Sequence, residues 1–138
     1  MEISPYLGFN GQCEEAFKFY EKVLGGKIEG IMTYGSSPIA AQMPPEMRDK
    51  IIHVRMLVGN QVLMGGDAPP QNFKPAEGFN VSITVKDAAE AERIFTELSK
   101  GGKITMPLQK TFWSVRFGMA VDRFGTPWII NCAQAACL

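Results

Sequence analysis

Apolar residues recur at helical spacing in two stretches of the chain. The first stretch predicts a helix over about Cys13–Leu24, which Gly25-Gly26 ends because glycine accepts the left-handed backbone that many helix ends require. In the second stretch, Asp87 is placed to cap the free N–H groups of a helix, and Glu90 stands three residues later as in a capping box. Gly101-Gly102 ends this second helix, so a glycine pair follows each of the two predicted helices.

Short alternating apolar runs before and after these helices predict strands. The predicted strands are Tyr6–Phe9, Lys27–Thr33, Ile51–Val58 and Gln61–Met64 in the first half, and Val81–Val85, Lys103–Met106, Ser114–Val121 and Trp128–Cys132 in the second. Gly59-Asn60 predicts a tight hairpin turn, and Asp122–Gly125 predicts the turn between the last two strands. Each half is therefore expected to form a βαβββ module.

An internal repeat supports this division of the chain. The tetrapeptide GGKI occurs at Gly25–Ile28 and again at Gly101–Ile104, and the same offset gives seven identities in the fifteen positions of 14–28 and 90–104. Such repeats indicate a duplicated structural unit. We expect one domain over residues 1–138, with a first module over 1–67, a linker over 68–78 and a second module over 79–138.

Two stretches show no regular pattern. Gly35–Lys50 is a long connection that contains proline and methionine, and Asp67–Gly78 contains three prolines and joins the modules. Long irregular segments in a compact domain tend to be functional lids or linkers. We interpret Gly35–Lys50 as a candidate lid and the second stretch as the linker.

The composition narrows the classes of partner. Fourteen basic and fourteen acidic side chains cancel, so no electrostatic feature indicates nucleic acid or an anionic membrane, and we expect neither as a partner. The acidic N-terminal segment does not resemble a signal peptide, and no apolar run approaches the roughly 20 residues that span a bilayer. Cys13, Cys132 and Cys137 form no pair at metal-ligand spacing, which favours reduced thiols in a cytoplasmic protein.

The paired modules, together with Phe19-Tyr20 before Val23-Leu24-Gly25 and the run Asp122–Trp128, resemble the vicinal oxygen chelate superfamily. This superfamily holds glyoxalase I, extradiol dioxygenases, and the bleomycin and fosfomycin resistance proteins. The chain is most similar to its PhnB-like branch. The segments that carry this similarity are Ser4-Pro5-Tyr6, His53, Leu63–Asp67, Thr111-Phe112-Trp113 and Phe124–Asn131.

The resemblance implies an α+β fold of two tandem βαβββ modules, whose curved mixed sheets form a cup with the helices outside. It also implies a homodimer. Chelating members hold a metal with four side chains, typically His or Gln and Glu in the first module and His and Glu in the second. In this chain the four positions fall on Pro5, on or next to Met64, on Asn80 and on Ile129. Neither these residues nor their immediate neighbours carry an imidazole or carboxylate group. We therefore predict no bound metal and no cofactor.

Uncharged polar residues alternate along the strand Val81–Val85. Period two places Asn80, Ser82 and Thr84 on one face, where they could orient a small ligand through hydrogen bonds. The alternative is that these three side chains bond only to neighbouring strands or to water.

Aromatic residues precede the next-to-last strand. Phe112 and Trp113 are candidate walls of a ligand site, and Arg116 is placed to hold a carboxylate or phosphate oxygen beside them. Trp128 is a further candidate wall. The alternative for Trp128 is packing in the core, and the alternative for Arg116 is an exposed, solvated side chain.

In the first module, His53 and Arg55 share a strand face with Leu57. If that face lines the cup, His53 is the natural general base, because histidine is the side chain that titrates near neutral pH. The alternative is a hydrogen-bonded structural histidine. Arg55 and Met64 complete the candidate ligand-binding residues of this module.

These observations favour a metal-free, PhnB-like protein that binds a small organic molecule in a partly aromatic cup. The competing class is an isomerase, lyase or dioxygenase that uses a metal or His53. A third class is a module that serves dimerisation alone. Proteins of this branch are also described as demethylubiquinone methyltransferases, but Leu7–Gly11 is not followed as a nucleotide-binding loop would be.

Overall fold

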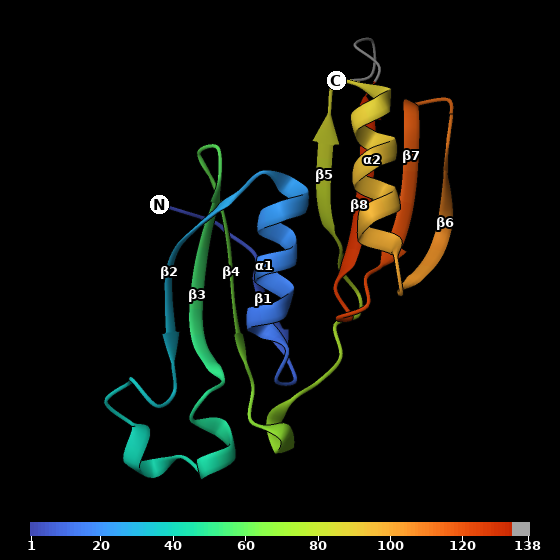
Figure 1. Cartoon of the computed structure of the whole chain (residues 1–138). Helices are drawn as coiled ribbons and strands as arrows, with labels where there is room; N and C mark the ends of the chain where they lie inside the picture. The colour runs from blue at the N-terminus through green and yellow to red at the C-terminus, as the bar shows by residue number, and fades with distance from the viewer. Residues whose placement is uncertain (134–138) are drawn as a thin grey trace. The chain divides into compact units, whose positions relative to one another are not determined.

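The computed structural model describes residues 1–133 and divides the chain into two compact units, Met1–Pro75 and the residues from Ala76 onward. Each unit places one α-helix against one four-stranded sheet (Figure 1). The predicted α+β organisation of two tandem βαβββ modules is confirmed. No helix within residues 1–133 is both long and apolar enough to cross a membrane.

The first unit has the strand order β1-β4-β3-β2. Its main elements are β1 (Tyr6–Phe9), α1 (Cys13–Leu24), β2 (Lys27–Thr33), β3 (Ile51–Val58) and β4 (Gln61–Asp67). β1 runs parallel to β4, and the other neighbours are antiparallel. β4 continues three residues past the predicted end at Met64, because Gly65, Gly66 and Asp67 pair with β1.

The second unit repeats this topology with the order β5-β8-β7-β6. Its elements are β5 (Val81–Val85), α2 (Ala88–Ser99), β6 (Lys103–Gln109), β7 (Ser114–Val121) and β8 (Pro127–Ala133). β6 continues past the predicted end at Met106 and includes Pro107. An edge strand tolerates a proline because one side of its backbone has no partner strand.

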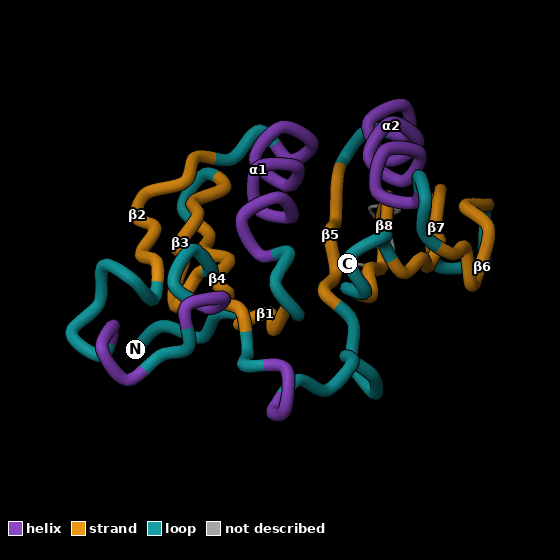
Figure 2. Tube along the Cα trace, turned by 60° about the horizontal axis from the view of Figure 1, so that its bottom comes forward, coloured by secondary structure: helices purple, strands orange, loops and turns teal. Residues whose placement is uncertain are grey.

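Each helix covers one face of its sheet, as Figure 2 shows. A Cβ atom on Gly65 would lie 2.7 Å from Phe17 of α1, and one on Gly118 would lie 2.8 Å from Phe95 of α2. These two glycines therefore mark the helix-covered faces. We call the opposite face of each sheet, which points away from the α-helix of the same unit, the helix-free face.

The two GGKI segments perform the same structural task. Gly25 and Gly101 adopt the left-handed backbone, with φ of 67° and 72°. A Cβ on Gly26 would lie 2.9 Å from the Leu57 carbonyl oxygen, and one on Gly102 would collide with the Val121 carbonyl. The first glycine of each pair ends the helix. The second lets the backbone pass close to a strand carbonyl, in β3 for Gly26 and in β7 for Gly102.

The segment between β2 and β3 is held at its base by two backbone hydrogen bonds. Tyr34 N donates to Lys50 O at 2.9 Å, and Gly35 N donates to Arg48 O at 2.8 Å. Two short 3-10 helices lie within it, η1 (Ala40–Gln42) and η2 (Pro45–Met47); a third, η3 (Pro70–Asn72), follows β4. A lid function for this segment stays a prediction.

The turn before β8 is organised by one buried carboxylate. Asp122 Oδ1 accepts hydrogen bonds from the N–H groups of Phe124 and Thr126 at 2.9 and 3.0 Å. Its Oδ2 accepts the indole N–H of Trp128 at 2.9 Å. Trp128 is 1% exposed, so its predicted alternative, core packing, is what the structure shows.

Candidate ligand-binding site

The helix-free face of the first sheet carries the candidate residues of the first module. Because Gly65 and its partner Val54 face α1, the alternate residues Met64 and Arg55 face the other way. Tyr6, Met64 and Arg55 lie side by side across β1, β4 and β3. We call these three residues the Tyr6 row.

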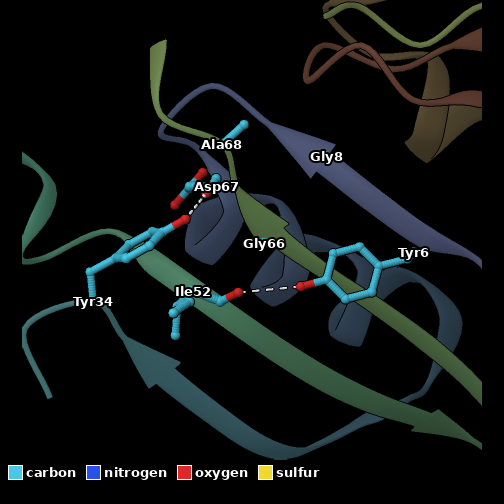
Figure 3. A pocket seen from close by; sticks show the side chains of 7 residues that line it. All are labelled: Tyr6, Gly8, Tyr34, Ile52, Gly66, Asp67 and Ala68. Carbon is cyan, nitrogen blue, oxygen red and sulfur yellow. Dashed lines mark hydrogen bonds between the residues drawn. The ribbon is translucent and has the colours of Figure 1, made fainter. Parts of the chain in front are cut away.

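A hollow lies next to the Tyr6 row, where Gly8 of β1 pairs with Gly66 of β4. It has a volume of about 220 Å³ and is lined by Tyr6, Gly8, Tyr34, Ile52, Gly66, Asp67 and Ala68. Figure 3 shows Tyr6 and Tyr34 approaching from opposite sides, with their hydroxyl groups directed inward. Two adjacent residues without side chains thus leave a depression between two aromatic rings.

The Tyr6 ring lies across Gly66. A Cβ on Gly66 would come within 2.9 Å of the Tyr6 hydroxyl and 2.7 Å of the Ile52 carbonyl, so only glycine leaves room for the ring. The Tyr6 hydroxyl donates to Ile52 O at 3.2 Å. Burial raises the pKa of Tyr6, chiefly because it disfavours the phenolate.

His53 is packed beside Tyr6. The two rings stack with centroids 5.7 Å apart and an interplanar angle of 24°. His53 Nδ1 lies 3.4 Å from the Tyr6 hydroxyl oxygen, and the imidazole remains exposed. The structure therefore brings His53 together with the Tyr6 row on one sheet face.

The far wall of the hollow is fixed by Tyr34 and Asp67. The Tyr34 hydroxyl donates to the Asp67 carbonyl at 2.6 Å. The Asp67 carboxylate accepts three backbone N–H groups, from Gly11 and Cys13 through Oδ1 and from Ile51 through Oδ2. This carboxylate therefore binds backbone N–H groups at the start of α1 and at the start of β3. Burial, followed by the negative charge of Asp67, raises the pKa of Tyr34.

Arg55 is held by two carboxylates. Its Nε donates to Glu29 Oε1 at 2.9 Å, and its two terminal nitrogens donate to Glu2 at 3.0 and 3.2 Å. One terminal nitrogen also lies 4.0 Å from the Met64 sulfur. The hydrogen bonds from Glu2 and then Glu29 raise the pKa of Arg55, so the guanidinium stays charged.

In the second unit, the structure places Ser82 and Thr84 on the helix-free face. They pair with Ile129 and Asn131, which alternate with residues on the helix-covered side of β8. Both hydroxyl residues are exposed, and Asn80 is exposed just before β5. The three residues are available to solvent and to a ligand.

Phe112 and Trp113 stand together before β7. Their rings meet edge to face at 4.6 Å, and Trp113 meets Phe117 edge to face at 5.4 Å. Phe112 is 88% exposed and Trp113 is 38% exposed. Phe117 belongs to this cluster but was not predicted from the sequence. The signal that could have identified it is its even spacing from Trp113, because residues at even spacing along a strand share a face.

Arg116 is not brought to this aromatic cluster. It pairs with Cys132 of the helix-covered face, and its Nε donates to Glu92 of α2 at 3.3 Å. Its Nη1 donates to the Val115 carbonyl at 2.8 Å. The structure thus assigns Arg116 a contact between β7 and the helix.

The two units differ at the positions that create the hollow. The pair Gly8 and Gly66 of the first unit corresponds to Thr84 and Asn131 in the second. Asn131 Oδ1 accepts a hydrogen bond at 2.6 Å from the buried Ser114 hydroxyl. Side chains therefore occupy in the second sheet the space that the glycine pair leaves open in the first.

The four positions that correspond to metal ligands do not offer a fitting donor set. Met64 N donates to Pro5 O at 3.1 Å, so these two positions are neighbours, while Asn80 precedes the strand that pairs with Ile129. Proline and isoleucine have no side-chain donor, a thioether suits soft metals, and an amide is a weak neutral ligand. Among residues 1–133, no three His, Cys, Asp or Glu side chains are grouped as a metal site.

Comparison with known proteins gives a consistent family. A family model described as 3-demethylubiquinone-9 3-methyltransferase matches residues 1–131. The chain is also similar to protein YjdN of Escherichia coli K12, with 34% identity over 142 residues that cover 97% of each protein.

Solved structures extend this similarity. Protein PA1353 of Pseudomonas aeruginosa has a TM-score of 0.89 and 44% identity, over 97% of this chain and 98% of that one. The PhnB protein of Bacillus cereus has a TM-score of 0.81 and 26% identity, over 95% and 98%. The fosfomycin resistance protein FosX of Mesorhizobium loti shares the fold alone, with a TM-score of 0.64 and 9% identity over 99% and 94%.

Proposed function

We propose that this chain binds a small organic molecule without a metal ion. The chain belongs to the family described as 3-demethylubiquinone-9 3-methyltransferase, which is the PhnB-like branch of the vicinal oxygen chelate superfamily. The observation that carries the proposal is the open hollow above Gly8 and Gly66, flanked by Tyr6 and Tyr34. A concave site with apolar walls and a few oriented polar groups is typical of small-molecule binding.

The lining of the hollow defines the part of the ligand that it accepts. Two tyrosine rings and bare glycine backbone offer flat, apolar contact, and the hydroxyl groups of the rings offer oriented polar contact. The volume of about 220 Å³ is below the ~300–1,000 Å³ of sites for drug-sized ligands. We therefore propose a compact, planar, uncharged group as the buried part of the ligand.

The second unit supplies a separate set of proposed contacts. Phe112 and Trp113 offer exposed aromatic surface, and Asn80, Ser82 and Thr84 offer amide and hydroxyl groups. These residues suit the same class of planar ligand with hydrogen-bonding substituents.

The substitution Gly8→Thr tests the proposal, because it copies Thr84 into the hollow. A Cβ on Gly8 meets no atom within 4 Å, so the variant is expected to fold and melt as the wild type does. Aromatic fragments that shift the amide NMR signals of Gly8, Gly66 and Ala68 should bind the variant at least tenfold more weakly. Gly30→Thr is the matched control, because a Cβ there also meets no atom within 4 Å. Equal fragment binding by wild type and Gly8→Thr would overturn the proposal.

Proton transfer by His53 is a second candidate function. The observation that favours it is the exposed imidazole stacked on Tyr6, whose hydroxyl lines the hollow. A base at this position could remove an acidic C–H proton from a bound ligand, as an isomerase or lyase requires. In D₂O, bound fragments with such a proton should exchange it, and His53→Gln should stop the exchange without weakening binding. Exchange that persists in His53→Gln rules this candidate out.

Methyl transfer is not part of the proposal. A nucleotide-binding turn after the first strand would present free backbone N–H groups to its ligand. In this chain the N–H groups of Gly11 and Cys13 are bonded to the Asp67 carboxylate.

We also propose a homodimer that resides in the cytoplasm. The resemblance to the superfamily supports the dimer, and the buried free thiols of Cys13 and Cys132 support a reducing compartment. Cys137 lies outside the described residues. Sedimentation equilibrium should give twice the chain mass of 15.2 kDa, and a mass of one chain would contradict the dimer.

A further inference from the structure

Glu2 occupies the guanidinium of Arg55 in the geometry of a bound carboxylate. Its two oxygens accept hydrogen bonds from the two terminal nitrogens of Arg55 at 3.0 and 3.2 Å. Paired hydrogen bonds of this kind are how arginine recognises carboxylates. The hydrogen bonds from Arg55 also lower the pKa of the Glu2 carboxyl group, so Glu2 is ionised at neutral pH.

Little else anchors the segment that carries Glu2. The residues before β1 belong to no helix or strand, and Met1 and Ile3 are exposed. The segment therefore buries almost no apolar side chain. Ion pairs between exposed side chains contribute little to stability. A competing carboxylate could replace Glu2 without breaking a packed contact.

The Tyr6 row extends from Arg55 over a distance that suits one aromatic ring. Arg55, Met64 and Tyr6 pair directly across three adjacent strands, and neighbouring strands lie about 4.8 Å apart. A ring attached to a carboxylate on Arg55 would cover the Met64 thioether and reach the edge of Tyr6. Thioethers and tyrosine rings are favourable neighbours for an aromatic group.

We propose that Arg55 anchors the carboxylate of an aromatic acid, and that Glu2 is an internal stand-in which the ligand displaces. This inference rests on the proposed ligand-binding function and names its ligand class. Exchange of one carboxylate for another leaves the local charge unchanged. Glu29 remains on Arg55 Nε, 2.9 Å away, and holds the guanidinium in its plane during the exchange.

Benzoate and its neutral isostere benzamide are suitable probes, titrated into the full chain and followed by amide NMR. We expect benzoate to bind more tightly than benzamide and to shift the signals of Met64 and Tyr6. Glu2→Gln should raise the affinity for benzoate at least threefold and leave the affinity for benzamide unchanged. The control Glu14→Gln removes the same charge from the exposed ion pair between Glu14 and Lys18, and should change neither affinity. Arg55→Gln should lower the affinity for benzoate to that for benzamide.

The outcomes separate this inference from the proposed function. If fragments bind over Gly8 but benzoate gains nothing over benzamide, the anchor at Arg55 is wrong and the ligand site stands. The anchor is equally wrong if Glu2→Gln and Glu14→Gln behave alike. If neither probe, nor any aromatic fragment, shifts the signals of Gly8, Gly66, Met64 or Tyr6, the proposed function fails and the anchor fails with it.

Discussion

Two buried aspartates show how single side chains organise each unit. Asp67 and Asp122 are both 3% exposed, and each accepts three N–H groups. A carboxylate has only acceptor atoms, so it matches sites where several donors converge. Asp67 joins β4 to α1 and β3, whereas Asp122 shapes a single turn.

Asp122→Asn should destabilise the protein by about 1–3 kcal/mol, because one amide donor must then face an N–H group. Either the Trp128 indole or the backbone N–H groups of Phe124 and Thr126 lose their acceptor. Asp87→Asn is the matched control, since Asp87 caps α2 through one hydrogen bond and asparagine caps equally well. Urea unfolding measures both, and equal free energies of unfolding for the two variants would contradict this role of Asp122.

Tyr34 should make the free energy of unfolding depend on pH in the alkaline range. Its pKa is raised above 10.0 in the folded chain, so the unfolded chain ionises first as the pH rises. The stability is fully present below pH 10 and is lost as the pH rises through the folded pKa. Tyr34→Phe should lower the free energy of unfolding by about 1 kcal/mol at neutral pH, through loss of the hydrogen bond to Asp67. Above about pH 10 its stability should fall less steeply than that of the wild type. Parallel pH profiles would show that Tyr34 does not contribute.

At the scale of elements, the glycine pair after each helix combines two different constraints. Gly25 needs the left-handed backbone but has no atom near its missing Cβ. Gly26 and Gly102 instead have a strand carbonyl where a Cβ would lie. The repeat thus preserves a helix end and a close approach of two backbones.

Alanine substitutions should separate these constraints. Gly25→Ala should cost about 1–2 kcal/mol, the strain of a left-handed backbone. Gly26→Ala should cost more, and Gly102→Ala most, because the Val121 backbone must move away from the new Cβ. Thermal or urea unfolding gives the order, and a larger loss for Gly25→Ala than for Gly102→Ala would contradict it.

Periodicity predicted most elements at their observed bounds because caps and glycine pairs mark them in the sequence. It ended β4 too early, since Gly65-Gly66-Asp67 shows no apolar alternation, and β6 too early, since Pro107 argues against a strand. These extensions depend on partner strands, which a local pattern does not contain.

The candidate site was predictable only in part. Period two placed His53 and Arg55 on one face, and the structure brings Met64 beside Arg55 on that face. The hollow depends on Gly8 pairing with Gly66, a register that no local signal specifies. Tyr34 arrives from the end of β2, and the capping of α1 by Asp67 joins residues 54 positions apart.

At the scale of the whole molecule, a duplicated module has diverged between its copies. The resemblance to the PhnB-like branch is confirmed by the family match over residues 1–131. Both units keep one topology, but glycines open the first sheet where Thr84 and Asn131 fill the second. The duplication preserves the scaffold, while the helix-free faces carry different chemistry.

Metal independence is the prediction that belongs to this scale. Protein purified without chelators should hold no stoichiometric Zn, Ni, Mn or Fe, because Pro5, Met64, Asn80 and Ile129 cannot supply a hard-ion site. Chelator treatment should leave the melting temperature and fragment affinity unchanged. Stoichiometric metal by elemental analysis, lost on substitution of Met64, would contradict the prediction.

The most direct measurement is a crystal structure of the chain with an aromatic fragment that binds it in solution. We predict that the fragment lies over the backbone of Gly8 and Gly66, between the rings of Tyr6 and Tyr34. No protein-coordinated ion should lie beside it. A fragment bound elsewhere while this hollow is closed, or a metal ion coordinated by protein atoms in its place, would contradict a metal-free ligand site in the first unit.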